Sequence, residues 1–118
     1  MKKTIVALFC GAAALSMSMS AHAGGDAAHG AELTKKYNCA SCHGADFKSP
    51  IDPTYPKLAG QHADYLVHAL TSYQRGNKGI SGRANPIMAG MAQPLSDQDK
   101  LDIATYLADL PGPLQTRK

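Results

Sequence analysis

The sequence lacks the features that define several common protein classes. It has no internal repeat and no low-complexity tract, and apolar and polar residues nowhere alternate with period two over a useful length, so neither a repeat array nor a β-sheet is indicated. No apolar run reaches the roughly 18 residues that a membrane-spanning helix needs. The formal net charge is only +3, without a basic cluster, and this argues against a nucleic-acid partner.

Cysteine is also scarce, since the 118 residues contain three, and the first of them lies in an N-terminal segment with its own character. Met1-Lys2-Lys3 gives a short basic start, an apolar run extends from Ile5 to Leu15, and Ala21-His22-Ala23 ends the segment. This order predicts a secretory signal peptide, residues 1–23, cleaved after Ala23. The apolar run is too short for an uncleaved anchor.

Export has consequences for the remaining domain, residues 24–118. Cys10 leaves with the signal peptide; we set aside its lipidation, because bulky Phe9 precedes it and most of the apolar run follows it. The formal charge falls to +1 and only Cys39 and Cys42 remain. In an oxidising periplasm, two such thiols must be paired, metallated or alkylated. A domain of 95 residues often depends on a cofactor, metal or disulfide for its core.

Local patterns predict an all-α domain. A first helix is expected from a cap at Asp26 to about Asn38, a second over 63–74, and a last one from a capping box at Ser96 to the prolines at 111 and 113. Gly30 inside the first helix predicts a close approach of another backbone. The last helix should bury the stripe Leu101, Ala104, Leu107 and Ala108.

The connections between these helices are long. Three prolines interrupt the segment after the cysteines, and three glycines and Pro86 predict a flexible stretch over 76–86. About thirty residues of loop would be unusual in so small a domain unless something fills its middle.

Cys39-Ala40-Ser41-Cys42-His43 is the attachment pattern of c-type haem. Two thiols at this spacing can reach the two vinyl groups of one porphyrin, and the following histidine then reaches the iron. A thioredoxin-like pair would need a βαβ context, a zinc site would need two further ligands, and a plain disulfide is the remaining alternative. The export signal together with His43 favours one covalently attached haem, with iron bound by His43.

The second axial ligand decides the chemistry. The mature chain has two methionines, Met88 and Met91, on the stretch before the last helix, and spacing alone does not choose between them. His62 and His68 are rival ligands, whereas Lys57 and Lys78 are typical solvated charges. Arg83 can pair with a haem propionate, because a guanidinium suits a carboxylate; an ordinary surface arginine is the alternative.

From Asp26 to Leu110 the chain resembles the small bacterial class I c-type cytochromes, and most of all one half of the dihaem periplasmic cytochromes and their monohaem relatives. The stretches that carry the resemblance are Cys39-Ala40-Ser41-Cys42-His43-Gly44, Tyr55-Pro56-Lys57-Leu58-Ala59-Gly60-Gln61, Tyr73-Gln74-Arg75-Gly76-Asn77, Ile87-Met88-Ala89-Gly90-Met91-Ala92 and Leu95-Ser96-Asp97-Gln98-Asp99.

The resemblance implies the class I cytochrome c fold, with three to four helices and long loops wrapped around one covalently bound haem. It implies Met88, rather than Met91, as the iron ligand, and a hydrogen bond from His43 to the carbonyl of Pro56. A second attachment motif is absent, so the function of a two-haem protein is not implied.

Iron with histidine and methionine ligands has no open position for a substrate, which favours electron transfer over catalysis. We therefore expect a periplasmic electron carrier that is not an enzyme, without stable membrane insertion, whose partners are redox proteins of a respiratory or periplasmic chain. A fixed haem subunit of a dehydrogenase or oxidase complex is the alternative, and a haem enzyme or gas sensor is less favoured.

Overall fold

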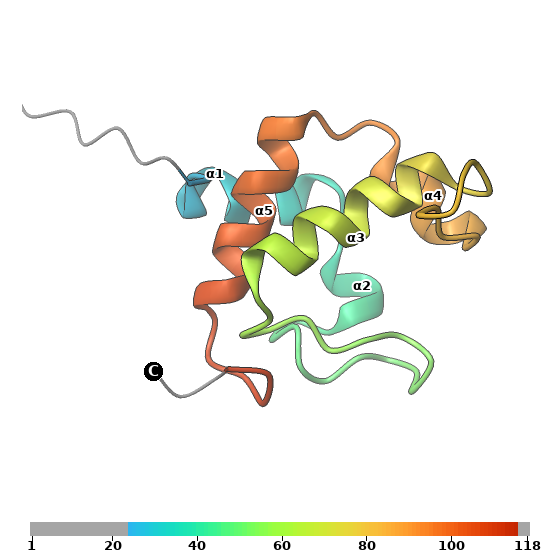
Figure 1. Ribbon diagram of the computed structural model, residues 1–118. Coiled ribbons are helices and arrows are strands. Elements are labelled where there is room, and N and C mark those ends of the chain that lie inside the picture. Colours follow the sequence, from blue (N-terminus) through green and yellow to red (C-terminus); the bar gives the residue numbers. More distant parts are fainter. Residues whose placement is uncertain (1–23, 116–118) are drawn as a thin grey trace, which may run out of the picture.

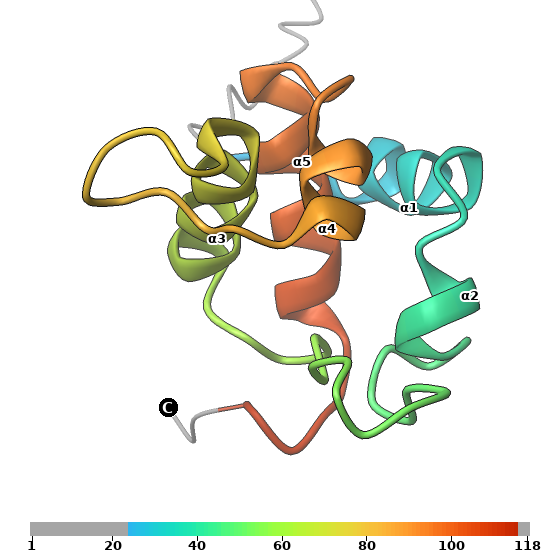
Figure 2. The same ribbon diagram turned by 90° about the vertical axis from the view of Figure 1, so that its right-hand side faces the viewer.

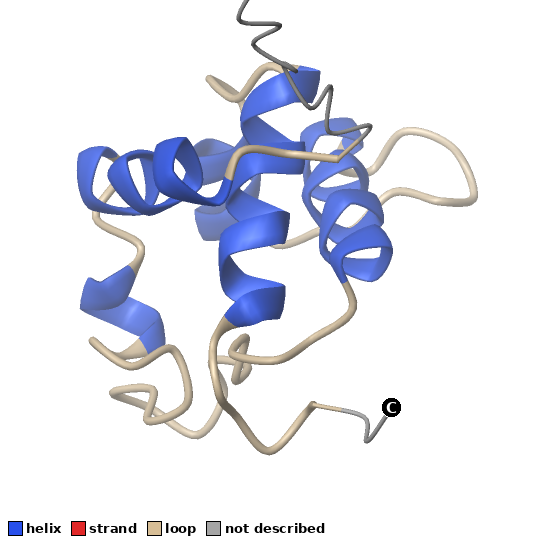
Figure 3. Ribbon diagram, turned by 90° about the vertical axis from the view of Figure 1, so that its left-hand side faces the viewer, coloured by secondary structure: helices blue, strands red, loops and turns tan. Residues whose placement is uncertain are grey.

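The computed structural model describes residues 24–115, so the predicted signal peptide and its cleavage site lie outside the described residues. This part of the chain forms the helices α1 (Ala27–Lys36), α2 (Ala40–His43), α3 (Ala63–Arg75), α4 (Pro86–Ala92) and α5 (Asp97–Asp109). Figure 3 shows helices and loops without a strand between residues 24 and 115. Within the same range, no helix has the length and apolar character needed to cross a membrane.

The three long helices confirm the predictions from local sequence. Asp26 caps α1 by accepting hydrogen bonds from the backbone N–H groups of Ala28 and His29. The capping box at the start of α5 is present, and α3 ends at Gly76, whose φ of 56° few other residues adopt. Two helix ends differ slightly, because α1 stops at Lys36 and α3 continues to Arg75.

Two short helices bring the described residues to five helices, against the three to four expected. α2 is a single turn at the cysteine motif, and α4 begins at Pro86, where the stretch predicted to be flexible, residues 76–86, ends. The start of α4 explains why this segment is ordered. The Asn85 side chain accepts from the N–H of Met88 at 3.0 Å, and Pro86 occupies the first helical position, where its fixed φ is favourable.

The core lies where α1 and α3 pack against α5 (Figure 1). Gly30 makes the α1–α5 contact possible, because a Cβ atom at this position would overlap the carbonyl of Asp102. The close approach predicted from this glycine is therefore confirmed. Eight apolar side chains form the buried cluster, namely Leu33, Phe47, Ala59, Leu66, Leu95, Ile103, Ala104 and Leu107.

The buried face of α5 differs from the predicted stripe. Ala104 and Leu107 are buried as expected, but Leu101 is 37% exposed, and Asp102 and Ile103 are buried in its place. The reason is that α1 crosses α5 at Asp102, and this crossing brings a carboxylate rather than a leucine into the interface.

α2 and α3 lie on opposite sides of α5, with α4 between them toward the viewer of Figure 2. The cysteine motif on α2 and the methionines on α4 are therefore carried by separate elements that the α1–α3–α5 core holds apart. Two loops join these elements. Residues 44–62 connect α2 to α3, and residues 76–85 connect α3 to α4.

Candidate functional site

The two cysteines lie one helical turn apart, with Cys39 as the N-cap of α2 and Cys42 inside the helix. The N–H groups of Cys42 and His43 both donate to the carbonyl of Cys39, at 3.3 and 3.2 Å. Residues three apart on such a turn are neighbours on one face, so the two thiols are presented together. Both are free and half-buried, and burial raises the pKa of the Cys39 thiol.

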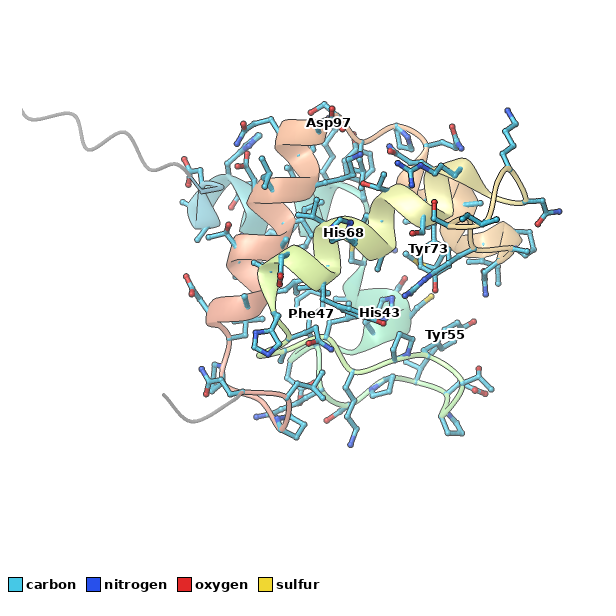
Figure 4. All side chains as sticks on the ribbon, in the orientation of Figure 1. His43, Phe47, Tyr55, His68, Tyr73 and Asp97 are labelled. Carbon is cyan, nitrogen blue, oxygen red and sulfur yellow. The ribbon has the colours of Figure 1, made fainter. Side chains whose placement is uncertain are left out.

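His43 is held in one orientation by the following loop. Its side chain is 5% exposed, and Nδ1 lies 2.9 Å from the carbonyl oxygen of Pro56, the contact that the resemblance implied. Because a carbonyl can only accept, Nδ1 carries the proton, and in this tautomer of the neutral ring Nε2 is the nitrogen that can bind a metal. Tyr55 lies edge-on to the imidazole, with 6.3 Å between the ring centroids (Figure 4).

Phe47 fixes the loop that supplies the Pro56 carbonyl. Its ring is 4% exposed and packs perpendicular to that of Tyr106, with the centroids 6.1 Å apart. Its backbone takes a positive φ of 54°, and its carbonyl accepts the N–H groups of Leu58 and Ala59 at 2.7 and 3.0 Å. A positive φ is unfavourable for phenylalanine, so the free energy gained by burying the ring must exceed the cost of this backbone conformation. Tertiary packing therefore decides the course of this loop.

The candidates for the second axial ligand are placed differently. Met88 and Met91 are both half-buried on α4, three residues apart and therefore on neighbouring positions of one face. His62 and His68 are exposed, the first as the N-cap of α3 and the second in its middle (Figure 4). Lys57 and Lys78 are also exposed, as expected of solvated charges.

Arg83 anchors the loop before α4 onto α3. Its guanidinium donates to the hydroxyl of Tyr65 at 3.1 Å and lies 5.5 and 5.4 Å from the ring centroids of Tyr65 and Tyr73. The hydrogen bond to Tyr65 raises the pKa of Arg83, and the nearby Tyr73 acts in the same direction. Sequence reasoning placed Tyr73 in a stretch that carries the resemblance but linked neither tyrosine to Arg83, although their spacing of eight residues places them on one face of a helix, about two turns apart.

These donors fit a c-type haem better than the alternatives. In residues 24–115, no group of three or more His, Cys, Asp or Glu side chains could hold a metal ion, which argues against zinc. The thiols are not joined in a disulfide. Two adjacent free thiols, an imidazole with Nε2 available and thioethers on a separate helix are instead the donor set that a covalently attached haem uses.

Comparison with known proteins points to the same cofactor. The family model described as "Cytochrome c" matches residues 27–111. Cytochrome c4 of Stutzerimonas stutzeri is 41% identical in an alignment of 117 positions that covers 95% of this chain and 52% of that protein. Cytochrome c-554(548) of Halomonas halodenitrificans is 43% identical over 82 residues, covering 70% of this chain and 93% of the relative.

A solved structure extends the likeness to three dimensions. The crystal structure of reduced recombinant cytochrome c4 from Pseudomonas stutzeri superimposes with a TM-score of 0.61 at 38% identity, over 75% of this chain and 47% of that one. The chain thus spans about half the length of these cytochromes c4. It carries one Cys-x-x-Cys-His motif and is similar to one half of them.

Proposed function

Because the chain belongs to the cytochrome c family, we propose that it is a monohaem electron carrier and not an enzyme. The cofactor of the family is covalently bound haem c, which supplies one-electron reduction and oxidation of its iron when bound. The remaining argument concerns what the residues of this chain do for that cofactor. Cys39 and Cys42 are the residues we propose for the two thioether bonds, which the shared face of their thiols supports.

We propose His43 as one iron ligand. Its Nδ1–H donates to the Pro56 carbonyl, and this bond fixes the tautomer and the ring orientation and makes Nε2 a better electron donor. Pro56 thereby belongs to the cofactor site through its backbone. Burial of the imidazole, with the ring of Tyr55 edge-on to it, restricts the access of water to this side of the site.

We propose Met88 as the ligand on the opposite side. Its half-buried place on α4 supports a role at the cofactor, and the exposure of His62 and His68 speaks against them. The Met-Ala-Gly sequence of the family favours Met88 over Met91. A neutral, soft thioether stabilises reduced iron and leaves no open coordination position, which suits outer-sphere electron transfer.

Arg83 is the residue we propose for a propionate. One of its five N–H donors is committed to Tyr65, so donors remain for a carboxylate. The two tyrosine rings hold the guanidinium against α3 and limit the entropy lost when an anion binds.

We further propose that the chain is exported to the periplasm as residues 24–118 and passes electrons between redox proteins of a respiratory or periplasmic chain. The +1 charge of this segment gives no strong field to favour an acidic or a basic docking partner. A carrier of this kind needs no stable insertion into a membrane.

The 2.9 Å contact between His43 Nδ1 and the Pro56 carbonyl carries the proposal, because it prepares an imidazole for iron in the motif that attaches haem. Optical spectra of the oxidised and reduced periplasmic protein test it, together with the intact mass. A sulfur-to-iron charge-transfer band toward the red end of the oxidised spectrum is expected, with a mass of Gly24 to Lys118 plus one haem. Rapid binding of carbon monoxide by the reduced protein would instead indicate an enzyme or a sensor, and elution within a large complex would indicate a fixed subunit.

A further inference from the structure

α4 depends on neighbouring elements for its stability. It has seven residues and buries only Ala92, while Ile87 is 55% exposed. A helix this short is not stable by itself in water, since helix nucleation is unfavourable and few hydrogen bonds follow it. The position of its methionines therefore depends on what neighbouring elements contribute to α4.

Gln74, on the last turn of α3, makes the main polar contact with the end of α4. Its side-chain Nε2 donates to the carbonyl of Ala92 at 2.8 Å and to the carbonyl of Leu95 at 2.7 Å. Ala92 is the last residue of α4, and Leu95 lies in the turn that follows it. The Ala92 carbonyl also accepts from the N–H of Leu95 at 3.1 Å, so Gln74 adds a bond from α3 to a turn that already closes the end of α4. Gln93 returns the contact, because its Nε2 donates to the backbone carbonyl of Gln74 at 2.9 Å.

Lys100 of α5 sets the orientation of the Gln74 amide. The lysine is 3% exposed, and its Nζ donates to Gln74 Oε1 at 2.8 Å and to Thr71 Oγ1 at 3.1 Å. Its third contact is an ion pair with Asp97 at 2.8 Å. With the amide oxygen fixed toward the ammonium group, the two N–H groups of Gln74 are directed at the end of α4.

The chain therefore contains a polar connection from α5 through α3 to α4 that is separate from the apolar core. Release of α4 requires breaking the bonds of Gln74 but not the α1–α5 contact, so α4 can open locally at a lower free energy than global unfolding. The strength of this connection then decides how often α4 leaves its place.

We propose that Gln74, oriented by Lys100, is a positioning residue that holds α4 and so keeps the methionine sulfur on the iron. This inference rests on the proposed ligation by Met88. It assigns a role beyond folding to a glutamine that does not touch the iron ligands. It also gives a role to the buried Lys100, whose ammonium group joins α5 to Thr71 and Gln74 of α3.

The test uses the haem-loaded protein and the variant Gln74→Glu. The carboxylate keeps an acceptor for Lys100 but cannot donate to the carbonyls of Ala92 and Leu95. On heating, the sulfur-to-iron band should be lost at a lower temperature than in the wild type. On acid or alkaline titration, it should be lost at a pH closer to neutral. The far-ultraviolet ellipticity should remain in both cases. The reduced variant should bind carbon monoxide about tenfold faster, the change expected when one or two net hydrogen bonds no longer oppose opening.

Thr71→Val is the matched control, because it removes a different hydrogen bond of Lys100 and leaves those of Gln74 to α4 intact. Its global stability should fall, but its band should disappear only with unfolding. Gln93→Ala is a milder second variant, since the side chain is exposed and only the reciprocal bond to Gln74 is lost. It should shift the band and the carbon monoxide rate in the same direction as Gln74→Glu, by less.

Two results together would show that the inference is wrong. In Gln74→Glu and Gln93→Ala the band would disappear only with global unfolding, as in Thr71→Val, and carbon monoxide would bind to them no faster than to the wild type. This outcome differs from a failure of the proposed ligation. Absence of the sulfur-to-iron band in the wild type would refute the methionine ligand itself, whereas a normal wild-type band with unaffected variants would refute only the role of Gln74.

Discussion

His29 and Asp102 connect the first and the last long helix, with the imidazole Nδ1 of His29 lying 2.6 Å from the carboxylate Oδ2 of Asp102. The histidine side chain is 53% exposed, whereas that of the aspartate is 3% exposed. The second carboxylate oxygen accepts from the backbone N–H of Asp26 at 2.7 Å and from the amide of Gln98 at 2.8 Å. A buried carboxylate is thus fully paired at the α1–α5 crossing, as a buried charge must be.

This pair should make stability depend on pH. The hydrogen bond to Asp102 raises the pKa of His29 above its usual 6.5, and the charges of Asp99 and Asp26 act in the same direction. Burial alone would raise the pKa of Asp102, but hydrogen bonds from His29, the Asp26 N–H and Gln98 outweigh it and lower this pKa.

The sign follows from which state binds the proton more tightly. The contribution of His29 to the free energy of unfolding is fully present below pH about 6.5 and is lost as pH rises through the raised pKa. The contribution of Asp102 is present above pH about 3.9 and is lost as pH falls through the lowered pKa. We expect the guanidinium chloride concentration at which half of the haem-loaded protein is unfolded to decrease between about pH 6 and pH 8. This is roughly the range in which His29 loses its proton. His29→Gln keeps a hydrogen-bond donor but does not titrate, so its stability should change less with pH than that of the wild type. Parallel pH profiles of stability in the two proteins would contradict the role of His29.

Gly30→Ala should destabilise the protein although alanine favours helices. The added methyl group meets the Asp102 carbonyl and the Tyr106 side chain, so α1 and α5 must separate. Overpacking of this kind costs about 1–3 kcal/mol of unfolding free energy, measured by denaturant titration. The reverse exchange at exposed Ala28, Ala28→Gly, should cost no more than about 1 kcal/mol of helix propensity. A more stable Gly30→Ala protein would show that the helices are not in contact there.

Met88→Ala should remove the sulfur-to-iron band, lower the reduction potential by removing a soft neutral ligand, and open the reduced iron to carbon monoxide. Met91→Ala is the control on the same helix. It should keep the band and the potential, and lose packing stability of up to about 2–5 kcal/mol if its side chain is buried by the cofactor. The opposite result would assign the ligand to Met91, and no effect from either would return attention to His62, His68 or an open site.

Haem should remain on the chain after extraction with acidified acetone if both thiols are bonded to it, as we propose. Cys39→Ala and Cys42→Ala should each give a protein with a single bond to the cofactor and a lower unfolding midpoint. The protein without haem should be largely unfolded in circular dichroism, because a domain of this size lacks the core that the haem would fill and would lose the contacts that the haem makes only in the folded state. Free extraction of haem from the native protein would refute the attachment.

Arg83→Leu should lower the reduction potential, because a positive charge near the site disfavours the oxidised, more positive iron. Tyr65→Phe is the matched control. It removes the hydrogen bond to the guanidinium but keeps the ring and the charge, so its potential should stay close to that of the wild type. Equal potentials in all three proteins would identify Arg83 as a surface arginine that only holds its loop on α3.

Local sequence was sufficient for the three long helices and for the attachment motif. Their caps, such as Asp26 and Ser96, act within three or four residues, and the apolar spacing of α3 repeats within one element. The motif is local for the same reason, because five consecutive residues carry two thiols and an imidazole. Gly30 was informative as well, since a glycine inside a helix costs stability and needs a contact to explain it.

Only the tertiary structure decided how distant groups meet around the site. The course of the 44–62 loop depends on Phe47 packing against Tyr106, and the fit of α4 depends on Gln74 and Lys100. The burial of Asp102 in place of Leu101 depends in the same way on where α1 crosses α5. These contacts join residues from 18 to 76 positions apart, as for Gln74 with Ala92 and Asp26 with Asp102. Periodicity and propensity describe one element at a time, whereas a buried polar group finds its partner only when separate elements have packed.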